Sequence, residues 1–126
     1  MMDRVITISV QGMTFKAVLN QCPTADAIWN ALPVTSSAAT WGDEIYFSTG
    51  VAVPLEPEAS AVVKKYDIGY WPPGRAICIF FGQTPVSTPT EIRAASEVTI
   101  IGRIEADAAD LRKVREDSPI QVEKAE

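Results

Sequence analysis

The residues best suited to chemistry in this chain are an acid and a phenol two positions apart, Glu44 and Tyr46. Side chains at positions i and i+2 of a β-strand point to the same face of a sheet, so the two groups can serve one site. Asp43 would point to the opposite face, which is poor geometry for sharing a proton or a metal ion with Glu44. A solvated turn is the favoured interpretation of this acidic pair, and a functional Glu44 is the alternative.

Large amphipathic side chains occur in the same parts of the chain. Tyrosine and tryptophan bury their rings and usually seek a partner for the polar end of the side chain. Ordinary packing is favoured for each of them taken singly, whereas as a set beside several prolines they form the best pocket candidate. The complete set of candidate ligand-binding residues is Trp41, Glu44, Tyr46, Tyr70, Trp71, Pro72, Phe81, Pro85 and Arg93.

Two members of this set have strong structural alternatives. Phe81 follows Phe80 in an apolar run, and adjacent strand residues point to opposite faces, so at most one of them lines a given pocket. Core packing is favoured for both phenylalanines. Arg93 lies two residues after Glu91, and an ion pair between them is favoured over binding of a ligand carboxylate.

The composition excludes several kinds of catalysis. The chain contains no histidine, which rules out Ser-His-Asp relays, Cys-His relays and histidine-based zinc sites. Its seven glycines are dispersed and form no phosphate-binding loop. We therefore predict no metal and no cofactor, and we assign no catalytic residue.

Length and composition are typical of one folded domain. The 126 residues are 47% hydrophobic and 21% charged, and the net charge is −5. Basic residues cluster only at Lys64-Lys65, so a nucleic-acid partner is not expected. The first ten residues lack the pattern of a signal peptide, and no apolar run reaches the roughly 18 residues of a membrane span. Cys22 and Cys78 fit reduced thiols better than a disulfide, so we predict a cytoplasmic protein without a membrane segment.

Alternating apolar residues predict the elements that position these side chains. Residues 4–10 and 13–19 are expected to form a hairpin around Gln11-Gly12, and residues 22–32 a short helix that ends at Pro33. Further strands are expected at 34–41, 44–48, 67–71, 75–81 and 97–104. A helical turn at 58–65, a loop at 83–96, a short helix at 106–115 and a frayed polar tail at 116–126 complete the prediction.

The segment 67–82 has the strongest pattern, two strands joined at a proline-glycine corner. Pro72 and Pro73 end the first strand because neither has an N–H to donate, and Gly74 is expected to supply a φ that other residues resist. The second strand is apolar on both faces, which indicates that both faces are covered. We therefore predict a mainly β fold, a closed antiparallel β-barrel of about eight strands with two or three short helices. Residues 1–115 would form this domain and residues 116–126 the tail.

Several segments together resemble a family of small prokaryotic proteins described as cyclophilin-like. They are Gly42-Asp-Glu-Ile-Tyr-Phe-Ser48, Asp67-Ile-Gly-Tyr-Trp-Pro-Pro-Gly74, Ile79-Phe-Phe-Gly82 with Thr84-Pro85, Ile101-Gly-Arg-Ile104, and Pro23-Thr-Ala25 with Leu32-Pro33. The resemblance covers roughly residues 5–105. It implies an eight-stranded antiparallel barrel of cyclophilin type in a smaller, atypical version. Most members of the family have no established activity, so the resemblance implies a fold and little chemistry.

Peptidyl-prolyl isomerase activity does not follow from the resemblance. Cyclophilins with this activity carry a Phe-His-Arg strand and a Phe-Met-Gln-Gly-Gly segment, and this chain has neither, so only the residue type of Arg75 or Arg93 suggests a substitute arginine. We favour a non-catalytic module that binds a small molecule or a proline-containing peptide. A weak prolyl isomerase and a small-metabolite enzyme with Glu44 as general base are the alternatives. A homodimer through a strand edge or the corner is left open.

Overall fold

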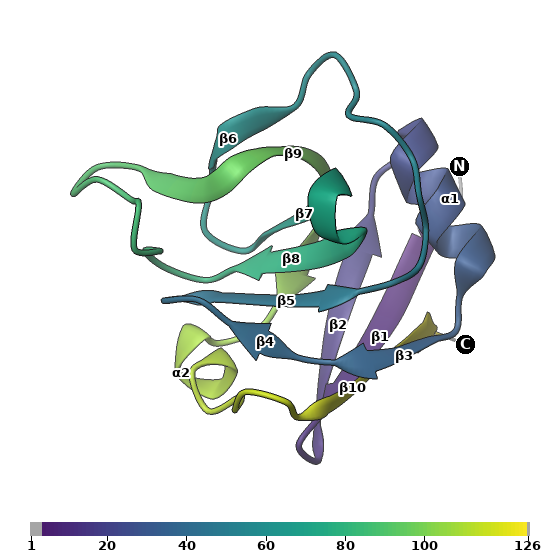
Figure 1. Cartoon of the computed structure of the whole chain (residues 1–126). Coiled ribbons are helices and arrows are strands. Elements are labelled where there is room, and N and C mark those ends of the chain that lie inside the picture. Colours follow the sequence, from purple (N-terminus) through teal and green to yellow (C-terminus); the bar gives the residue numbers. More distant parts are fainter. Residues whose placement is uncertain (1–3, 126) are drawn as a thin grey trace.

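The computed structural model describes residues 4–125 (Figure 1). Residues 1–3 and 126 lie outside this range. The first residues of the predicted domain, the last residue of the predicted tail and part of the segment considered as a signal peptide are therefore outside the described structure. The described chain forms ten strands, two α-helices and one 3-10 turn. It contains no helix long and apolar enough to cross a membrane.

The predicted N-terminal hairpin and helix are confirmed. β1 (Arg4–Val10) pairs antiparallel with β2 (Met13–Leu19), and the turn between them places Gln11 and Gly12 at φ values of 52° and 76°. α1 (Pro23–Ala31) begins after Cys22, whose thiol accepts a hydrogen bond from the N–H of Ala25. Cys22 and Cys78 are both free thiols.

All strand pairs in the structure are antiparallel, and they form one long curved sheet. Its order is β3-β10-β1-β2-β9-β7-β8-β5-β4, with β6 attached to β9. The remaining bounds are β3 (Val34–Ser37), β4 (Ala39–Thr40), β5 (Glu44–Ser48), β6 (Ser60–Val63), β7 (Asp67–Trp71), β8 (Ala76–Phe80), β9 (Ile92–Glu105) and β10 (Pro119–Lys124).

The predicted closed barrel of eight strands is wrong in two respects. Within the described part of the chain, the sheet has ten strands, and no ladder joins its two end strands, β3 and β4. These two strands are consecutive parts of one extended segment, separated only by Ala38. They therefore follow each other along the chain and do not pair side by side. The mainly β class and the number of helices are confirmed.

Four segments differ from the prediction. Residues 58–65 were expected to form a helical turn, but Ser60–Val63 is a strand, in keeping with its β-branched Val62 and Val63. β9 begins at Ile92, within the predicted loop, because residues 92–93 pair with β6. The predicted polar tail contains β10, which pairs with both β1 and β3. α2 (Ala108–Leu111) is shorter than the predicted helix at 106–115.

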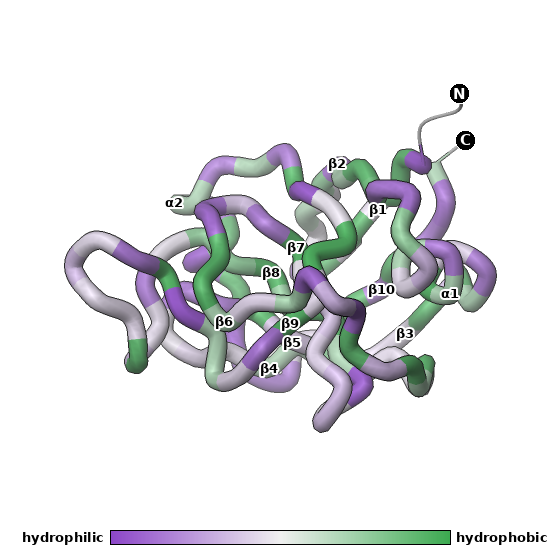
Figure 2. The backbone as a smooth tube through the Cα atoms, turned by 90° about the horizontal axis from the view of Figure 1, so that it is seen from above, coloured by the Kyte–Doolittle hydropathy of each residue, from purple (hydrophilic) through white to green (hydrophobic). Residues whose placement is uncertain are grey.

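Hydrophobic side chains gather on both faces of one part of this sheet. The main core lies on one face and includes Phe47, Tyr70, Ile77 and Ile79. On the other face, a second group of buried residues that we call the outer cluster consists of Val63, Cys78, Phe80, Ala94 and Val98. The prediction that strand β8 is covered on both faces is thus confirmed. Figure 2 shows hydrophobic residues, in green, along the central strand β8.

Candidate functional site

A small cavity lies on the outer face of the sheet, against the outer cluster. Its volume is about 130 Å³, and its lining residues are Trp41, Glu44, Tyr46, Trp71 and Ala95. Four of these five belong to the candidate set predicted from the sequence. Other surface depressions are larger, such as one of about 310 Å³ beside the β1–β2 turn, but that one is lined mainly by turn and strand-edge residues such as Gln11 and Gly12. The outer cavity is therefore the one that combines aromatic walls with a buried acid.

Strand β5 places the acid and the phenol in the cavity. Ile45 and Phe47 face the main core, so the alternate residues Glu44 and Tyr46 face outward, as predicted from their spacing. The register with β8 sets Glu44 opposite Phe80 and Tyr46 opposite Cys78. Two buried side chains of the outer cluster thus lie beside the acid and the phenol on the same face of the sheet.

Glu44 is a buried carboxyl group, and one of its two oxygen atoms forms no hydrogen bond within residues 4–125. The residue is only 5% exposed, and its Oε1 atom has no hydrogen-bond partner in the described structure. Burial raises the pKa of Glu44 to about 7, against a smaller lowering effect of a hydrogen bond with the Cys78 thiol. Near neutral pH this carboxyl group can therefore either accept or donate a proton.

The thiol beside Glu44 is a neutral neighbour. Burial raises the pKa of Cys78 well above its ordinary value, and the nearby Glu44 raises it further. A thiol of this kind is not a nucleophile at neutral pH, because the thiolate is the reactive form. Cys78 is therefore a buried, unreactive neighbour of Glu44 in the outer cluster.

The proline-glycine corner holds Trp71 in place, but by a different device from the one predicted. The residue with an unusual backbone is Arg75, at φ 47°, and not Gly74. Gly74 is required for space, since a Cβ there would lie 3.0 Å from the Trp71 ring. The indole Nε1 donates a hydrogen bond of 2.6 Å to the Oγ of Ser96. The 3-10 turn (Pro72–Gly74) and β9 thus fix the indole from two sides.

A tight turn positions Trp41 beside Glu44. The N–H of Trp41 donates a hydrogen bond of 3.0 Å to the carbonyl of Glu44. Gly42 follows at φ 61°, and a Cβ there would lie 2.9 Å from both the carbonyl of Gln83 and the ring of Pro85. Pro85 therefore packs against the turn and does not line the cavity.

Three further candidates do not line the cavity. Tyr70 is fully buried in the main core, and its hydroxyl donates a hydrogen bond to the carbonyl of Val51. Phe81 also belongs to the core, with the Arg112 guanidinium 5.9 Å from its ring centre. Pro72 lies in the 3-10 turn and supports Trp71 only through the backbone geometry of the corner.

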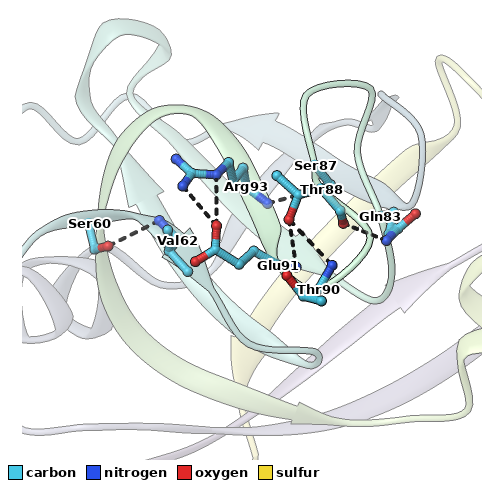
Figure 3. Close-up of polar contacts among 8 residues, drawn as sticks. All are labelled: Ser60, Val62, Gln83, Ser87, Thr88, Thr90, Glu91 and Arg93. Carbon is cyan, nitrogen blue, oxygen red and sulfur yellow. Dashed lines mark hydrogen bonds and ion pairs between the residues drawn. The ribbon is translucent and has the colours of Figure 1, made fainter.

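Arg93 forms the predicted ion pair with Glu91. Its Nε and Nη2 atoms donate to Oε1 of Glu91 at 3.2 and 2.8 Å (Figure 3). The loop before this pair is held by its own hydrogen bonds, such as that from Gln83 to the carbonyl of Thr88 at 2.7 Å. Asp43 also forms an ion pair, between its Oδ2 and the Nη2 of Arg112 at 2.9 Å, on the other side of β5 from Glu44. Neither arginine lines the cavity.

Sequence reasoning missed Ala95 and Ser96. Both were assigned to a loop, and only the pairing of β6 with β9 shows that they belong to a strand beside Trp71. Cys78 was expected to be a core residue, and it is buried, as part of the outer cluster. Within residues 4–125 no group of three or more acids and cysteines is arranged to hold a metal ion.

The fold and the cavity together define a class of protein: a small antiparallel β domain that carries an aromatic, acid-containing cavity on the outer face of its sheet. Residues 4–123 match the family model described as Cyclophilin-like, and the chain belongs to this family. Its structure is similar to the solution structure of the hypothetical protein AF2241 from Archaeoglobus fulgidus, with a TM-score of 0.81 and 40% sequence identity. That similarity covers 98% of this chain and 95% of the archaeal one. None of the curated proteins matches the chain.

Proposed function

We propose that this chain is a non-catalytic binding protein whose outer cavity holds a small molecule or one side chain of a peptide. Residues from the β4–β5 turn, β5, β7 and β9 converge on the cavity although they are far apart in the sequence. With about 130 Å³ it is smaller than the roughly 300 Å³ at which cavities begin to hold drug-sized ligands. A small group is therefore the expected occupant.

The unpartnered Oε1 of Glu44 carries this proposal. A buried polar atom without a hydrogen bond costs about 1 to 3 kcal/mol, so it is rare in a side chain whose only role is packing. A bound group that donates to this oxygen, or that carries a positive charge, would offset the loss. Aromatic walls around one polar group are also the usual composition of a ligand site.

Fluorescence can test the proposal because the tryptophans are few. The chain has three, and the variant Trp29→Phe leaves only Trp41 and Trp71, both at the cavity. In this background we expect some members of a library of small metabolites and proline-containing peptides to shift the emission and raise Tm. Glu44→Gln should weaken these hits, and Glu97→Gln, at an exposed position outside the cavity, should not. A library without a single such hit would contradict the proposal.

General acid–base catalysis by Glu44 is a second candidate, favoured by the pKa of about 7. A catalytic group is most effective when its pKa lies near the working pH. If a hit is converted to product, Glu44→Gln should abolish turnover, and unchanged turnover in this variant would exclude the role.

The prolyl isomerase alternative gains no support from the cavity. Its lining includes no arginine, since Arg93 pairs with Glu91 and the side chain of Arg75 is exposed beyond the corner. A proline-limited peptide assay at micromolar protein is the direct test, and a rate above background that is lost in Trp71→Ala would revive it.

A further inference from the structure

We propose that the ligand of the outer cavity is a small methylated ammonium cation, held by the rings of Trp41, Tyr46 and Trp71 with Glu44 as its counter-charge. This inference rests on the proposed function, because it names the ligand class for the same cavity.

The aromatic composition of the walls is the first reason. All three large side chains that line the cavity are tryptophan or tyrosine, and each is half-buried. The electron-rich faces of such rings attract cations, and cages of this composition bind quaternary and methylated ammonium groups. A neutral apolar ligand would contact the rings equally well, so the walls alone do not decide the charge of the ligand.

The charge of the cavity is the second reason. Glu44 is its one ionisable carboxyl, its Oε1 is unpartnered and buried, and no lysine or arginine is among the lining residues. An anionic ligand would meet repulsion without any compensating positive charge. A cation would instead form an ion pair in a partly desolvated setting, where the attraction exceeds that at an open surface.

The size of the cavity is the third reason. An apolar cavity of about 150 Å³ accommodates one benzene molecule, and this one has about 130 Å³. A trimethylammonium group is of this size, whereas a nucleotide or a sugar is much larger. The expected ligand therefore places only its ammonium head in the cavity and leaves the rest of the molecule outside.

This ligand class predicts a pH dependence with a definite sign. Binding of a cation favours the ionised form of Glu44, so below about pH 7 a proton must first be released. Among the groups near Glu44, Cys78 from β8 remains a neutral thiol, and Trp71 from β7 and Ala95 from β9 do not ionise. Tyr46 is the other titratable side chain that lines the cavity. On the other side of β5, Asp43 is paired with Arg112. The affinity for a permanently charged cation should thus fall by up to about tenfold per pH unit below pH 7 and be constant above about pH 8.

Choline and 3,3-dimethylbutan-1-ol form the matched probe pair, because they have nearly the same shape and differ in charge. We expect the wild-type protein at pH 8 to bind choline at least about tenfold more tightly than the neutral alcohol, by calorimetry or tryptophan fluorescence. Glu44→Gln should bring the two affinities to within about threefold, whereas Glu97→Gln should leave their ratio unchanged. The pH series on the unmodified protein needs no variant and so does not depend on how well Glu44→Gln folds.

The outcomes separate this inference from the proposed function. Equal binding of choline and the alcohol, or choline binding that does not weaken below pH 7, would overturn the cation assignment and leave the cavity as a site for neutral ligands. If neither probe binds but other library compounds bind in a way that depends on Glu44 and Trp71, the cation assignment is likewise overturned and the binding role of the cavity is kept. If neither probe binds and the library gives no hit, both proposals fail.

Discussion

Glu44 combines two properties that conflict in a residue with a purely structural role. It is almost fully buried, and one of its carboxylate oxygens has no partner in the described structure. A glutamine or a leucine at this position would avoid the desolvation of a charge. The neighbouring core positions of β5, Ile45 and Phe47, show that the strand can be filled with apolar side chains. The acid therefore lowers the stability of the protein at high pH, and a binding role would explain why it is there.

The raised pKa of Glu44 predicts how stability depends on pH. In the unfolded chain the group titrates near 4.5 and in the folded protein near 7, so between these values the folded state holds more protons. Stability from this group is therefore complete below about pH 4.5 and is lost as the pH rises to 7. The difference corresponds to at most about 3.5 kcal/mol, at about 1.4 kcal/mol per pKa unit. Glu44→Gln should remove this decline and make the protein more stable than wild type at pH 8.

Urea unfolding of both proteins at a series of pH values measures the effect. Glu97→Gln is the matched control, because it removes an exposed carboxylate close by and should leave the pH dependence of the wild type almost unchanged. Parallel stability curves for wild type and Glu44→Gln would show that the pKa of Glu44 is not raised.

At the scale of elements, the cavity depends on the short 3-10 turn between β7 and β8. This turn brings Gly74 under the Trp71 ring, while Ser96 of β9 holds the indole nitrogen from the other side. Neither contact is made by a strand ladder, so the position of the ring depends on side-chain packing at the corner. A small change in the turn should therefore alter the cavity and leave the sheet intact.

Gly74→Ala tests this dependence. Gly74 does not have a positive φ, so the added methyl group acts only through its contact with the ring, at 3.0 Å. We expect a loss of about 1 to 3 kcal/mol in stability, a changed Trp71 fluorescence in the Trp29→Phe background, and weaker binding of any cavity ligand. Gly50→Ala is a useful comparison, because it is strained by its φ of +79° but has no atom within 4 Å of the new methyl group. It should lower stability without changing Trp71. Equal fluorescence of Gly74→Ala and wild type would contradict the packing argument.

Helices and strands with a clear pattern of apolar residues could be predicted from the sequence, and those with a weak pattern could not. The β1–β2 hairpin and β8 follow from alternation and from a fully apolar run. β10 was not predicted because only two of its residues, Ile120 and Val122, are buried, and the others are exposed. Such a short alternation is hard to distinguish from a polar tail. β6 and the start of β9 are strands because they pair with each other, and such a long-range partner is not visible in either sequence alone.

The arrangement of the candidate residues could be predicted where strand spacing alone decides which face of the sheet a side chain occupies. The common face of Glu44 and Tyr46 was predicted from the period of a strand. The same rule places Tyr70 and Trp71 on opposite faces, although both were included in the candidate set. Whether Tyr70 or Trp71 faces outward depends on which face of the sheet the main core covers. The packing of the whole sheet determines this face. Tyr70 therefore belongs to the core and Trp71 to the cavity. Ala95 carries no chemical signal and could be found only from the fold.

At the scale of the whole molecule, the sheet order that runs from β3 to β4 has two end strands in the described residues, because β3 and β4 do not pair with each other. An unpaired edge can pair with a second copy of the chain unless its backbone groups are occupied. The edge of β4 is occupied by a side chain from far along the sequence: Oε1 of Glu116 accepts hydrogen bonds from the N–H and the hydroxyl of Thr40, at 3.0 and 3.1 Å. This contact places the acid where a partner strand would otherwise donate and accept.

Glu116→Ala should therefore shift the protein toward self-association. Loss of the two exposed hydrogen bonds should lower stability by only about 1 kcal/mol, so the fold should remain. The freed N–H of Thr40 and the loss of a repelling carboxylate should favour pairing of β4 edges between two copies, which sedimentation at rising concentration would detect as a larger dimer fraction than in wild type. Glu123→Ala removes a charge from an exposed position of β10 and is the control, with no such increase expected. A Glu116→Ala protein that sediments like wild type at every concentration would mean that the short length of β4, and not the acid, protects this edge.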